Sequence, residues 1–353
     1  MYLCLRNMAT LHIFNPEHDI ALASNLANFT APHAGRLLRA DLGFLPALWA
    51  KEGDAILVDN VEYAEKAWRR VAGRLSLSRS QRFLTKSQLS ALSDIDAIRP
   101  WGWDSALKAV LKRSGVQESL LPSDAQLDHI RQLSHRRVAA ALLPQLQTEG
   151  TVGEAYECTQ PSEVEALLAR YGQVVMKAPW SSSGRGLRFL SASRTPFEMQ
   201  AGWFRNVVER QGSVMVEPYY SKVKDFGMEL YADADGRIRY EGLSLFHTIN
   251  GAYVGNVLAT ENAKREIISR YIPVHLLDTI EQKITNTLSL GDYCGPFGID
   301  MMIVEGKVHP CVEINLRRTM GHVALSLTPN DDEVQKVMRI RLTDHYKLSI
   351  NKL

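Results

Sequence analysis

Two apolar runs that flank Glu305-Gly306 predict a β-hairpin over residues 298–315, which read GIDMMIVEGKVHPCVEIN. A two-residue turn can join antiparallel strands directly, although Asn-Gly would be the stronger signal. With Val304 paired to Lys307, the placement of the other side chains follows from the alternation of strand residues between two faces. The hairpin therefore predicts which polar residues lie near one another.

Two acids and an amide fall on one face of this hairpin. In that register Asp300 lies opposite Cys311, and Cys311, Glu313 and Asn315 share its face. Glu313 is then diagonal to Asp300, at roughly 7–8 Å between Cα atoms. Two carboxylates on one patch destabilise the fold unless a cation binds there. A hard cation such as Mg²⁺ binds carboxylate and amide oxygens. The alternative is an exposed face whose acids are solvated, and the hairpin alone does not decide between the two.

A lysine at a strand end precedes a loop of small residues in the segment 173–190, which reads QVVMKAPWSSSGRGLRFL. Lys177 lies at the end of the apolar run, where its ammonium group could bind a phosphate group as a point charge. Small residues let backbone N–H groups turn toward phosphates. This loop comprises Ser181, Ser182, Ser183, Gly184, Arg185 and Gly186. It is neither a Walker A loop nor a GxGxxG loop. The alternative is an ordinary hairpin loop with a solvated lysine.

A second strand end carries an acid suited to nucleobase recognition. Residues 214–219 read VMVEPY, and Glu217 near their end can accept from an amino group on an adenine edge. Asp225 follows eight residues later and could reach ribose hydroxyls. An ordinary strand terminus with two exposed acids is the alternative.

The length and composition of the chain limit the classes of protein to which it can belong. A chain of 353 residues predicts two or three domains. Its net charge of +2 argues against a dedicated nucleic-acid surface. No apolar run approaches the roughly 20 residues of a membrane helix. The segment before residue 11 is too short for a signal peptide, and Met8 is an alternative start to Met1. Four scattered cysteines (Cys4, Cys158, Cys294 and Cys311) predict free thiols in the cytoplasm.

Hydrophobic periodicity predicts an α/β region followed by an α+β region. Strands at 11–15, 55–58 and 95–101 alternate with helices at 34–50 and 103–114, which predicts an open parallel sheet. The later segments read as helices at 124–148 (interrupted or kinked near Pro144), 162–171, 196–210, 261–289 and 331–346. They read as strands at 155–158, 173–178, 187–191, 213–218, 226–232, 237–248, 252–259, 296–304 and 307–315.

The order of these signals resembles the ATP-grasp family, which includes D-alanine–D-alanine ligase, biotin carboxylase and the carbamoyl phosphate synthetase large subunit. The likeness spans residues 134–326 and rests on a basic helix start, a lysine strand, a Ser/Gly loop, a glutamate hinge and the Asp300…Glu313-x-Asn315 set. It implies an open α/β pre-ATP-grasp domain over 1–122. A two-subdomain ATP-grasp fold would follow, with subdomains at 123–216 and 217–353.

The resemblance also implies roles for individual residues. Arg136 and Lys177 would contact phosphates, with Lys177 on the α- and β-phosphates. The loop Ser181–Gly186 would close over the nucleotide. Glu217 and the backbone near Tyr219 would bind adenine, and Asp225 would bind the ribose. Asp300, Glu313 and Asn315 would bind Mg²⁺. Arg317 or Arg318 would hold a carboxylate or the acyl phosphate. A surface cluster is the alternative for the two arginines.

The implied activity is an ADP-forming ligase that activates a small carboxylate as an acyl phosphate for attack by an amine or thiol. The expected cofactors are ATP and Mg²⁺, with Mn²⁺ as an alternative metal, and a homodimer is left open. Gly298 departs from D-alanine ligase-like members, which carry an arginine at this position. A kinase using the same nucleotide site and a nucleotide-binding module without turnover are the rival interpretations.

Substrate contacts are expected between the domains, from three groups of residues. Loops past strand ends are favoured ligand positions in open α/β sheets. The candidates are Glu17, His18 and Asp19 after the first strand, Trp101, Trp103 and Asp104, and His247, Asn250, Tyr253 and Asn256. Capping and core packing are the alternatives for each group.

Overall fold

The computed structural model describes residues 9–75, 77, 80–181, 184, 186–249 and 252–352. Ser182, Ser183, Arg185 and Asn250, four of the predicted site residues, lie outside the described residues. The chain forms two compact units. The first holds residues up to 130 together with Met338–Asn351, and the second holds Arg131–Val337.

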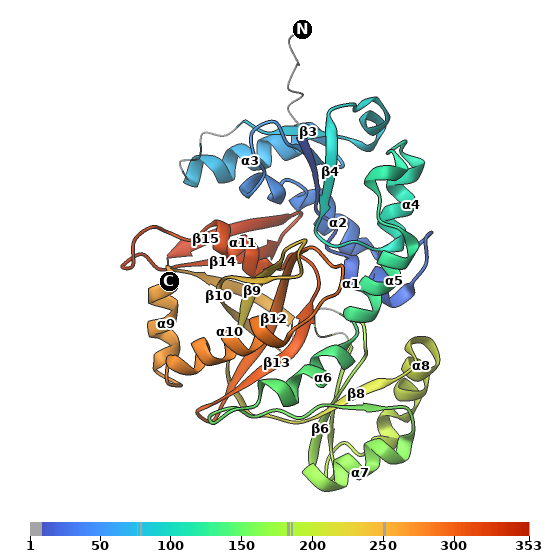
Figure 1. Cartoon of the computed structure of the whole chain (residues 1–353), viewed down its shortest axis with the longest axis vertical. Helices are drawn as coiled ribbons and strands as arrows, with labels where there is room; N and C mark the ends of the chain where they lie inside the picture. The colour runs from blue at the N-terminus through green and yellow to red at the C-terminus, as the bar shows by residue number, and fades with distance from the viewer. Residues whose placement is uncertain are drawn as a thin grey trace. The chain divides into compact units, whose positions relative to one another are not determined.

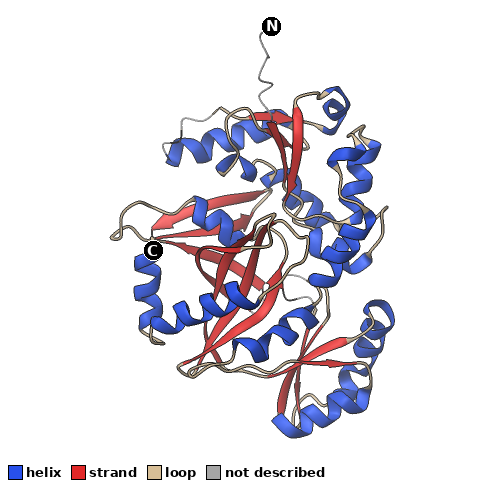
Figure 2. Cartoon of the chain, in the orientation of Figure 1, coloured by secondary structure: helices blue, strands red, loops and turns tan. Residues whose placement is uncertain are grey.

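The first unit is built on a parallel sheet, as the sequence predicts. Its strands follow the order β3-β2-β1-β4 and alternate with helices along the chain. Figure 2 draws the strands in red and the helices in blue. The elements are β1 (Ala9–Ile13), α1 (His18–Ser24), α2 (His33–Leu42), β2 (Ala55–Leu57), α3 (Val61–Leu75), β3 (Arg82–Leu84), β4 (Ile95–Pro100), α4 (Ser105–Arg113) and the start of α5 (Asp124–Leu133). Leu11, Ala55 and Leu111 belong to its core.

A buried ion pair ties β1 to the loop before β2. His12 Nε2 lies 3.0 Å from Asp54 Oδ2. Asp54 also accepts hydrogen bonds from the backbone N–H groups of Thr10 and Lys51, each at 2.9 Å. Burial acts to raise the pKa of Asp54, but the hydrogen bonds from Thr10, His12 and Lys51 outweigh it and hold that pKa below the usual value.

We therefore expect acid to destabilise this unit through Asp54. Because the pKa is lower in the folded than in the unfolded chain, the carboxylate stabilises the fold above its unfolded-state pKa. That contribution is lost as the pH falls through the folded-state value. Urea unfolding at about pH 6 and about pH 3 should show a smaller acid-induced loss of unfolding free energy for Asp54→Asn than for the wild type. Equal losses would contradict this origin.

The second unit contains a small antiparallel sheet in the order β5-β8-β6-β7. Its elements are β5 (Tyr156–Cys158), α7 (Pro161–Tyr171), β6 (Gln173–Lys177), β7 (Leu187–Ser191), α8 (Ala201–Gln211) and β8 (Val214–Pro218). Helix α7 begins with Pro161 after a capping box of Gln160 and Glu163, and it stops at Gly172, whose φ of 73° suits glycine. Both helices pack on the sheet through residues such as Val164, Phe204 and Met176.

A larger antiparallel arrangement in the order β13-β12-β9-β10-β11 completes this unit (Figure 1). The strands are β9 (Lys222–Ala232), β10 (Ile238–Ile249), β11 (Ala252–Leu258), β12 (Gly295–Val304) and β13 (Lys307–Asn315). The helices are α6 (Arg136–Leu146), α9 (Glu261–Ser269), α10 (His275–Thr287) and α11 (Met320–Ser326). Helix α6 packs along β13.

The predicted hairpin is present, but its register changes beyond the turn. Glu305 and Gly306 have positive φ values of 48° and 77°, and Val304 pairs with Lys307. Between Met302 and Asp300 the register shifts, so Asp300 pairs with Glu313 and not with Cys311. The predicted diagonal placement of Glu313 is therefore wrong. The shift spans Pro310, whose ring removes the N–H that a regular ladder needs, and bulges accommodate such residues.

Several predicted helices differ from the structure. The helix predicted over 261–289 is two helices, because Pro273 lies between α9 and α10. The helix predicted over 124–148 is α5 and α6, with His135 as the N-cap of α6, and the one over 34–50 ends at Leu42. The helix predicted over 331–346 is wrong, because this segment forms β14 (Lys336–Leu342) and the start of β15 (Tyr346–Lys352). Among the described residues, no helix is both long and apolar enough to span a bilayer.

Candidate functional site

Arg136 joins three segments of the second unit. It is the first residue of α6 and is only 8% exposed. Its guanidinium donates to Ala178 O at 2.6 Å, to Ser181 Oγ at 2.8 Å and to Glu313 Oε2 at 2.7 Å. Its Nε is buried without a hydrogen-bond partner among the described residues. The structure therefore brings a predicted phosphate contact against the predicted loop and a predicted metal ligand.

Lys177 and Glu217 form a buried ion pair. Lys177 ends β6 and Glu217 lies near the end of β8, and Lys177 Nζ donates to Glu217 Oε2 at 2.6 Å. The two residues are 7% and 5% exposed. Because both side chains are buried, their charges have lost most of their hydration, and each charge is stabilised mainly by the other.

The predicted metal ligands lie together on β12 and β13. Asp300 pairs directly with Glu313, and Asn315 Oδ1 accepts from the Arg317 guanidinium at 2.9 Å. Burial, followed by the charges of Glu313 and Glu229, raises the pKa of Asp300 to about 8, although Arg317 and a hydrogen bond with Asn315 act to lower it. Burial and the two neighbouring carboxylates therefore outweigh the effects of Arg317 and Asn315 on Asp300. Within the described residues, no three His, Cys, Asp or Glu side chains are grouped to hold a metal ion, and the predicted set consists of two carboxylates and an amide.

The charges of the Lys177–Glu217 pair and those of the Asp300 and Glu313 carboxylates both act on the buried thiol of Cys311. Burial raises its pKa, the nearby charges of Glu217, Asp300 and Glu313 raise it further, and Lys177 lowers it. Cys311 therefore lies within electrostatic reach of both the lysine pair and the metal carboxylates. Residues that the sequence places in four separate segments converge here.

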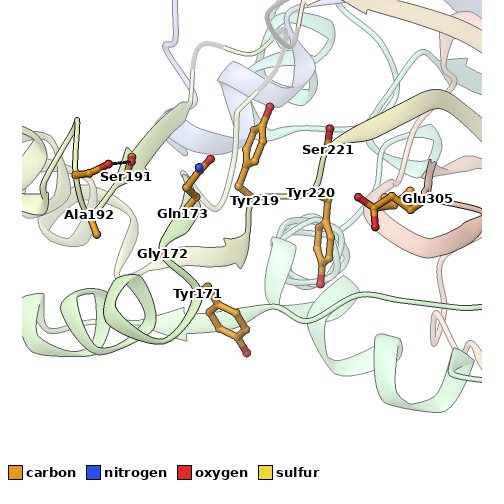
Figure 3. A pocket seen from close by; sticks show the side chains of 11 residues that line it. Tyr171, Gly172, Gln173, Ser191, Ala192, Tyr219, Tyr220, Ser221 and Glu305 are labelled. Atoms are coloured by element: carbon orange, nitrogen blue, oxygen red, sulfur yellow. Dashed lines mark hydrogen bonds between the residues drawn. The ribbon is translucent and has the colours of Figure 1, made fainter.

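The hinge between β8 and β9 carries two tyrosines that point in opposite directions (Figure 3). Tyr219 is 48% exposed, with its ring 6.0 Å from that of Phe189, whereas the Tyr220 ring lies 5.5 Å from that of His309. A cavity of about 680 Å³ is lined by both tyrosines. The charged residues Arg136, Lys177, Glu217, Asp300 and Glu313 do not line this cavity. The candidate site is therefore defined by these residues and not by the cavity.

Comparisons with known proteins identify the fold. No protein-family model and no curated protein matches the sequence. The solved structures do. N5-carboxyaminoimidazole synthetase from Staphylococcus aureus, complexed with ADP, matches with a TM-score of 0.52 and 14% identity, covering 95% of this chain and 82% of that one. Biotin carboxylase from Campylobacter jejuni matches with a TM-score of 0.53 and 12% identity over 95% and 76% of the two chains. A third match is the biotin carboxylase domain of Hydrogenobacter thermophilus 2-oxoglutarate carboxylase, with a TM-score of 0.51 and 12% identity over 94% and 74%.

The chain has the ATP-grasp fold. The predicted fold class, an open α/β N-terminal region followed by the ATP-grasp arrangement, is confirmed.

The described part of the Ser/Gly loop is tightly closed at its base. Ala178 N–H donates to Gly186 O at 2.8 Å. A Cβ added at Gly186 would lie 2.3 Å from Ser181 Oγ, so only glycine fits there. Gly184 has a φ of 72°, which also favours glycine.

The predicted ribose contact and the residues near 250 occupy β9 to β11. Asp225 accepts from Lys222 Nζ and from Thr248 Oγ1, each at 2.6 Å. Tyr253 donates to Asn256, which donates to Ser244 Oγ at 2.8 Å. These side chains share the face of Asp300. His247 follows Phe246, the strand partner of Asp225, and so lies on the opposite face.

The predicted N-terminal candidates cluster at the carboxyl ends of β1 and β4 within the first unit. Glu17 pairs with Arg39, and His18 Nδ1 lies 3.2 Å from Asp104 Oδ2. Asp104 also caps α4 by accepting from Leu107 N–H at 2.8 Å. Asp19 lies in the first turn of α1. Trp101, the tryptophan after β4, is buried with its ring against that of Phe14. Trp103 is partly buried and packs against the core cluster that contains Leu11 and Leu111.

Sequence reasoning missed a buried polar group on the carboxylate face. Glu229 of β9 accepts from Thr319 Oγ1 at 2.7 Å, and His322 Nδ1 lies 2.9 Å from the same carboxylate. The available signal was a single acid inside the apolar run at 226–232, FGMELYA, which no solvent-facing alternation explains.

Proposed function

We propose that this chain is an ATP-dependent ligase that activates a small carboxylate as an acyl phosphate and passes it to an amine or thiol. The observation that carries this proposal is the group of charges formed by the contact of Arg136 with Glu313, the strand pairing of Glu313 with Asp300 and the buried Lys177–Glu217 pair. Cations beside paired carboxylates suit a bound metal–nucleotide, because phosphoryl transfer depends mainly on positioning and charge stabilisation. The fold adds support, since the three structures it resembles are complexes with ADP, with β-γ-ATP, and with MgADP, ADP and bicarbonate.

The residues present fit Mg²⁺. Two carboxylates and an amide oxygen form a hard-ligand set, and Asp300 is buried beside Glu313 and Glu229, whose charges add to the effect of burial in raising its pKa. Asp300, Glu313 and Asn315 would hold the ion, and Mn²⁺ takes similar oxygen ligands. When bound, such an ion neutralises charge on phosphate oxygens.

The remaining residues would bind and orient the reactants. Arg136 and Lys177 would hold phosphates, Glu217 and the backbone near Tyr219 would bind adenine, Asp225 would bind ribose, and Arg317 or Arg318 would hold the substrate carboxylate. A carboxylate oxygen attacks the γ-phosphorus and ADP leaves. The acceptor then attacks the acyl carbon, inorganic phosphate leaves with its electron pair, and the acceptor loses one proton.

Trapping with hydroxylamine tests the acyl phosphate. We expect the protein with Mg-ATP and hydroxylamine to form a hydroxamate, ADP and inorganic phosphate with at least one acid from a panel of amino acids, peptides and small carboxylates. The hydroxamate reports the activated acyl group whatever the natural acceptor is. A stable phosphorylated product without hydroxamate would favour a kinase, and nucleotide binding without acid-dependent turnover would favour a binding module.

A further inference from the structure

Trp180 lies directly before Ser181, at the base of the Ser/Gly loop, and is 6% exposed. Its indole N–H donates to Arg131 O at 3.0 Å, and Cζ of Arg131 lies over the ring, 3.8 Å from its centroid. The backbone N–H of Trp180 donates to Gln211 Oε1 at 2.9 Å. Contacts from α5 and α8 therefore hold both the side chain and the backbone of this tryptophan.

The residues on either side of Trp180 determine where the guanidinium of Arg136 lies. The Arg136 side chain donates to Ala178 O at 2.6 Å and to Ser181 Oγ at 2.8 Å. Its backbone N–H also donates to Pro179 O at 3.4 Å. Three hydrogen bonds from one arginine thus end on the irregular segment 178–181, which follows β6 and contains the tryptophan.

Trp180 also contacts the start of α6 directly. The His135 ring lies edge-on to the indole, with centroids 4.7 Å apart and planes at 82°. His135 is the N-cap of α6 and immediately precedes Arg136. Burial, together with the charges of the neighbouring arginines, lowers the pKa of His135 to about 3, so the ring packs in its neutral form. The indole therefore supports Arg136 both through the segment 178–181 and through the helix start.

An arginine binds phosphate more tightly when its guanidinium is already oriented, because less side-chain freedom is lost on binding. We infer that Trp180 is a positioning residue: by anchoring the segment 178–181 to α5, α6 and α8, it orients the guanidinium of Arg136 for the phosphates of the nucleotide. This inference rests on the nucleotide site of the proposed function. Trp180 acts through Arg136, so its effect on nucleotide binding depends on that side chain.

A double-mutant cycle tests this dependence. Calorimetry gives the Kd for Mg-ADP of the wild type, Trp180→Leu, Arg136→Lys and the double variant. We expect Trp180→Leu to raise the Kd about tenfold, a coupling typical of residues in one contact network. In the Arg136→Lys background the same substitution should change the Kd by less than about twofold. A lysine ammonium lacks the fork that reaches Ala178 O and Ser181 Oγ together.

Trp203→Leu is the matched control. Trp203 belongs to α8 of the same unit, has the Arg188 guanidinium 5.0 Å from its ring and packs against the core of the small sheet. This variant should keep the wild-type Kd for Mg-ADP. If Trp180→Leu does not fold, Trp180→Phe retains an aromatic ring for Arg131 but removes the indole N–H. It should raise the Kd about threefold, the effect of losing one hydrogen bond, and again only with Arg136 present.

The possible failures are distinguishable. An unchanged Kd for Mg-ADP in the Trp180 variants, or an equal rise in the wild-type and Arg136→Lys backgrounds, overturns this inference and leaves the nucleotide site in place. A wild type that does not bind Mg-ADP overturns the proposed nucleotide site itself. A wild type that binds Mg-ADP but forms no hydroxamate overturns only the ligase proposal.

Discussion

Replacing Glu313 by glutamine should lower acid-dependent ADP release by about 10²–10³-fold, the range found when one preorganised electrostatic contact to a transition state is removed. Glu313 pairs with Asp300 and accepts from Arg136 at 2.7 Å. Glutamine preserves the shape and one acceptor for Arg136 but removes the charge that a metal ion requires. Turnover with Mg-ATP and Mn²⁺ binding by electron paramagnetic resonance should both decline, whereas the melting temperature should not.

Glu305→Gln is the matched control for that experiment. Glu305 belongs to the same hairpin but lies exposed at its turn. We expect this variant to retain both turnover and Mn²⁺ binding. A Glu313→Gln protein with wild-type activity and metal binding would remove Glu313 from the site.

Lys177→Met should destabilise the second unit as well as abolish nucleotide binding. The substitution leaves Glu217, which is 5% exposed, as an unpaired buried carboxylate. Breaking a buried pair in this way typically costs about 3–5 kcal/mol of unfolding free energy. Urea denaturation measures the loss, and binding of Mg-ADP by calorimetry measures the functional effect.

The double variant Lys177→Met/Glu217→Leu separates stability from function. Because apolar residues of similar volume often replace a buried ion pair without loss, the double variant should regain most of the unfolding free energy. It should still fail to bind Mg-ADP. Lys112→Met, which breaks an exposed pair with Glu118, should leave the melting temperature unchanged. A double variant that is no more stable than Lys177→Met would show that the pair is not the cause.

The sequence predicts local features of the candidate site well and long-range ones poorly. Alternation and the Glu305-Gly306 turn are local signals, and both hold in the structure. The bulge at Pro310 depends on how β13 meets its neighbour, so simple alternation misplaced Glu313 by two residues. The Lys177–Glu217 pair spans 40 residues of chain, and no spacing rule in the sequence indicates it.

The errors in the fold have similar physical causes. The segment 331–346 contains helix-forming residues, but alternation in KVMRIRL (336–342) suits a strand, and pairing within a sheet decides the outcome. Pro273 divides the long predicted helix, since it lacks the N–H that the helix interior needs. Glu229 escaped notice because its partners, Thr319 and His322, lie about 90 residues away.

The pairing of Arg136 with Glu313 links two binding equilibria. If the proposed function holds, a metal ion that takes Glu313 frees the guanidinium of Arg136 for phosphate, and phosphate that takes Arg136 frees the carboxylate for metal. Each ligand then removes the free-energy cost of breaking the Arg136–Glu313 ion pair, which the other ligand would otherwise have to overcome. Thermodynamic reciprocity requires both affinities to rise by the same factor. An internal ion pair of this kind favours the intact metal–nucleotide over either component alone.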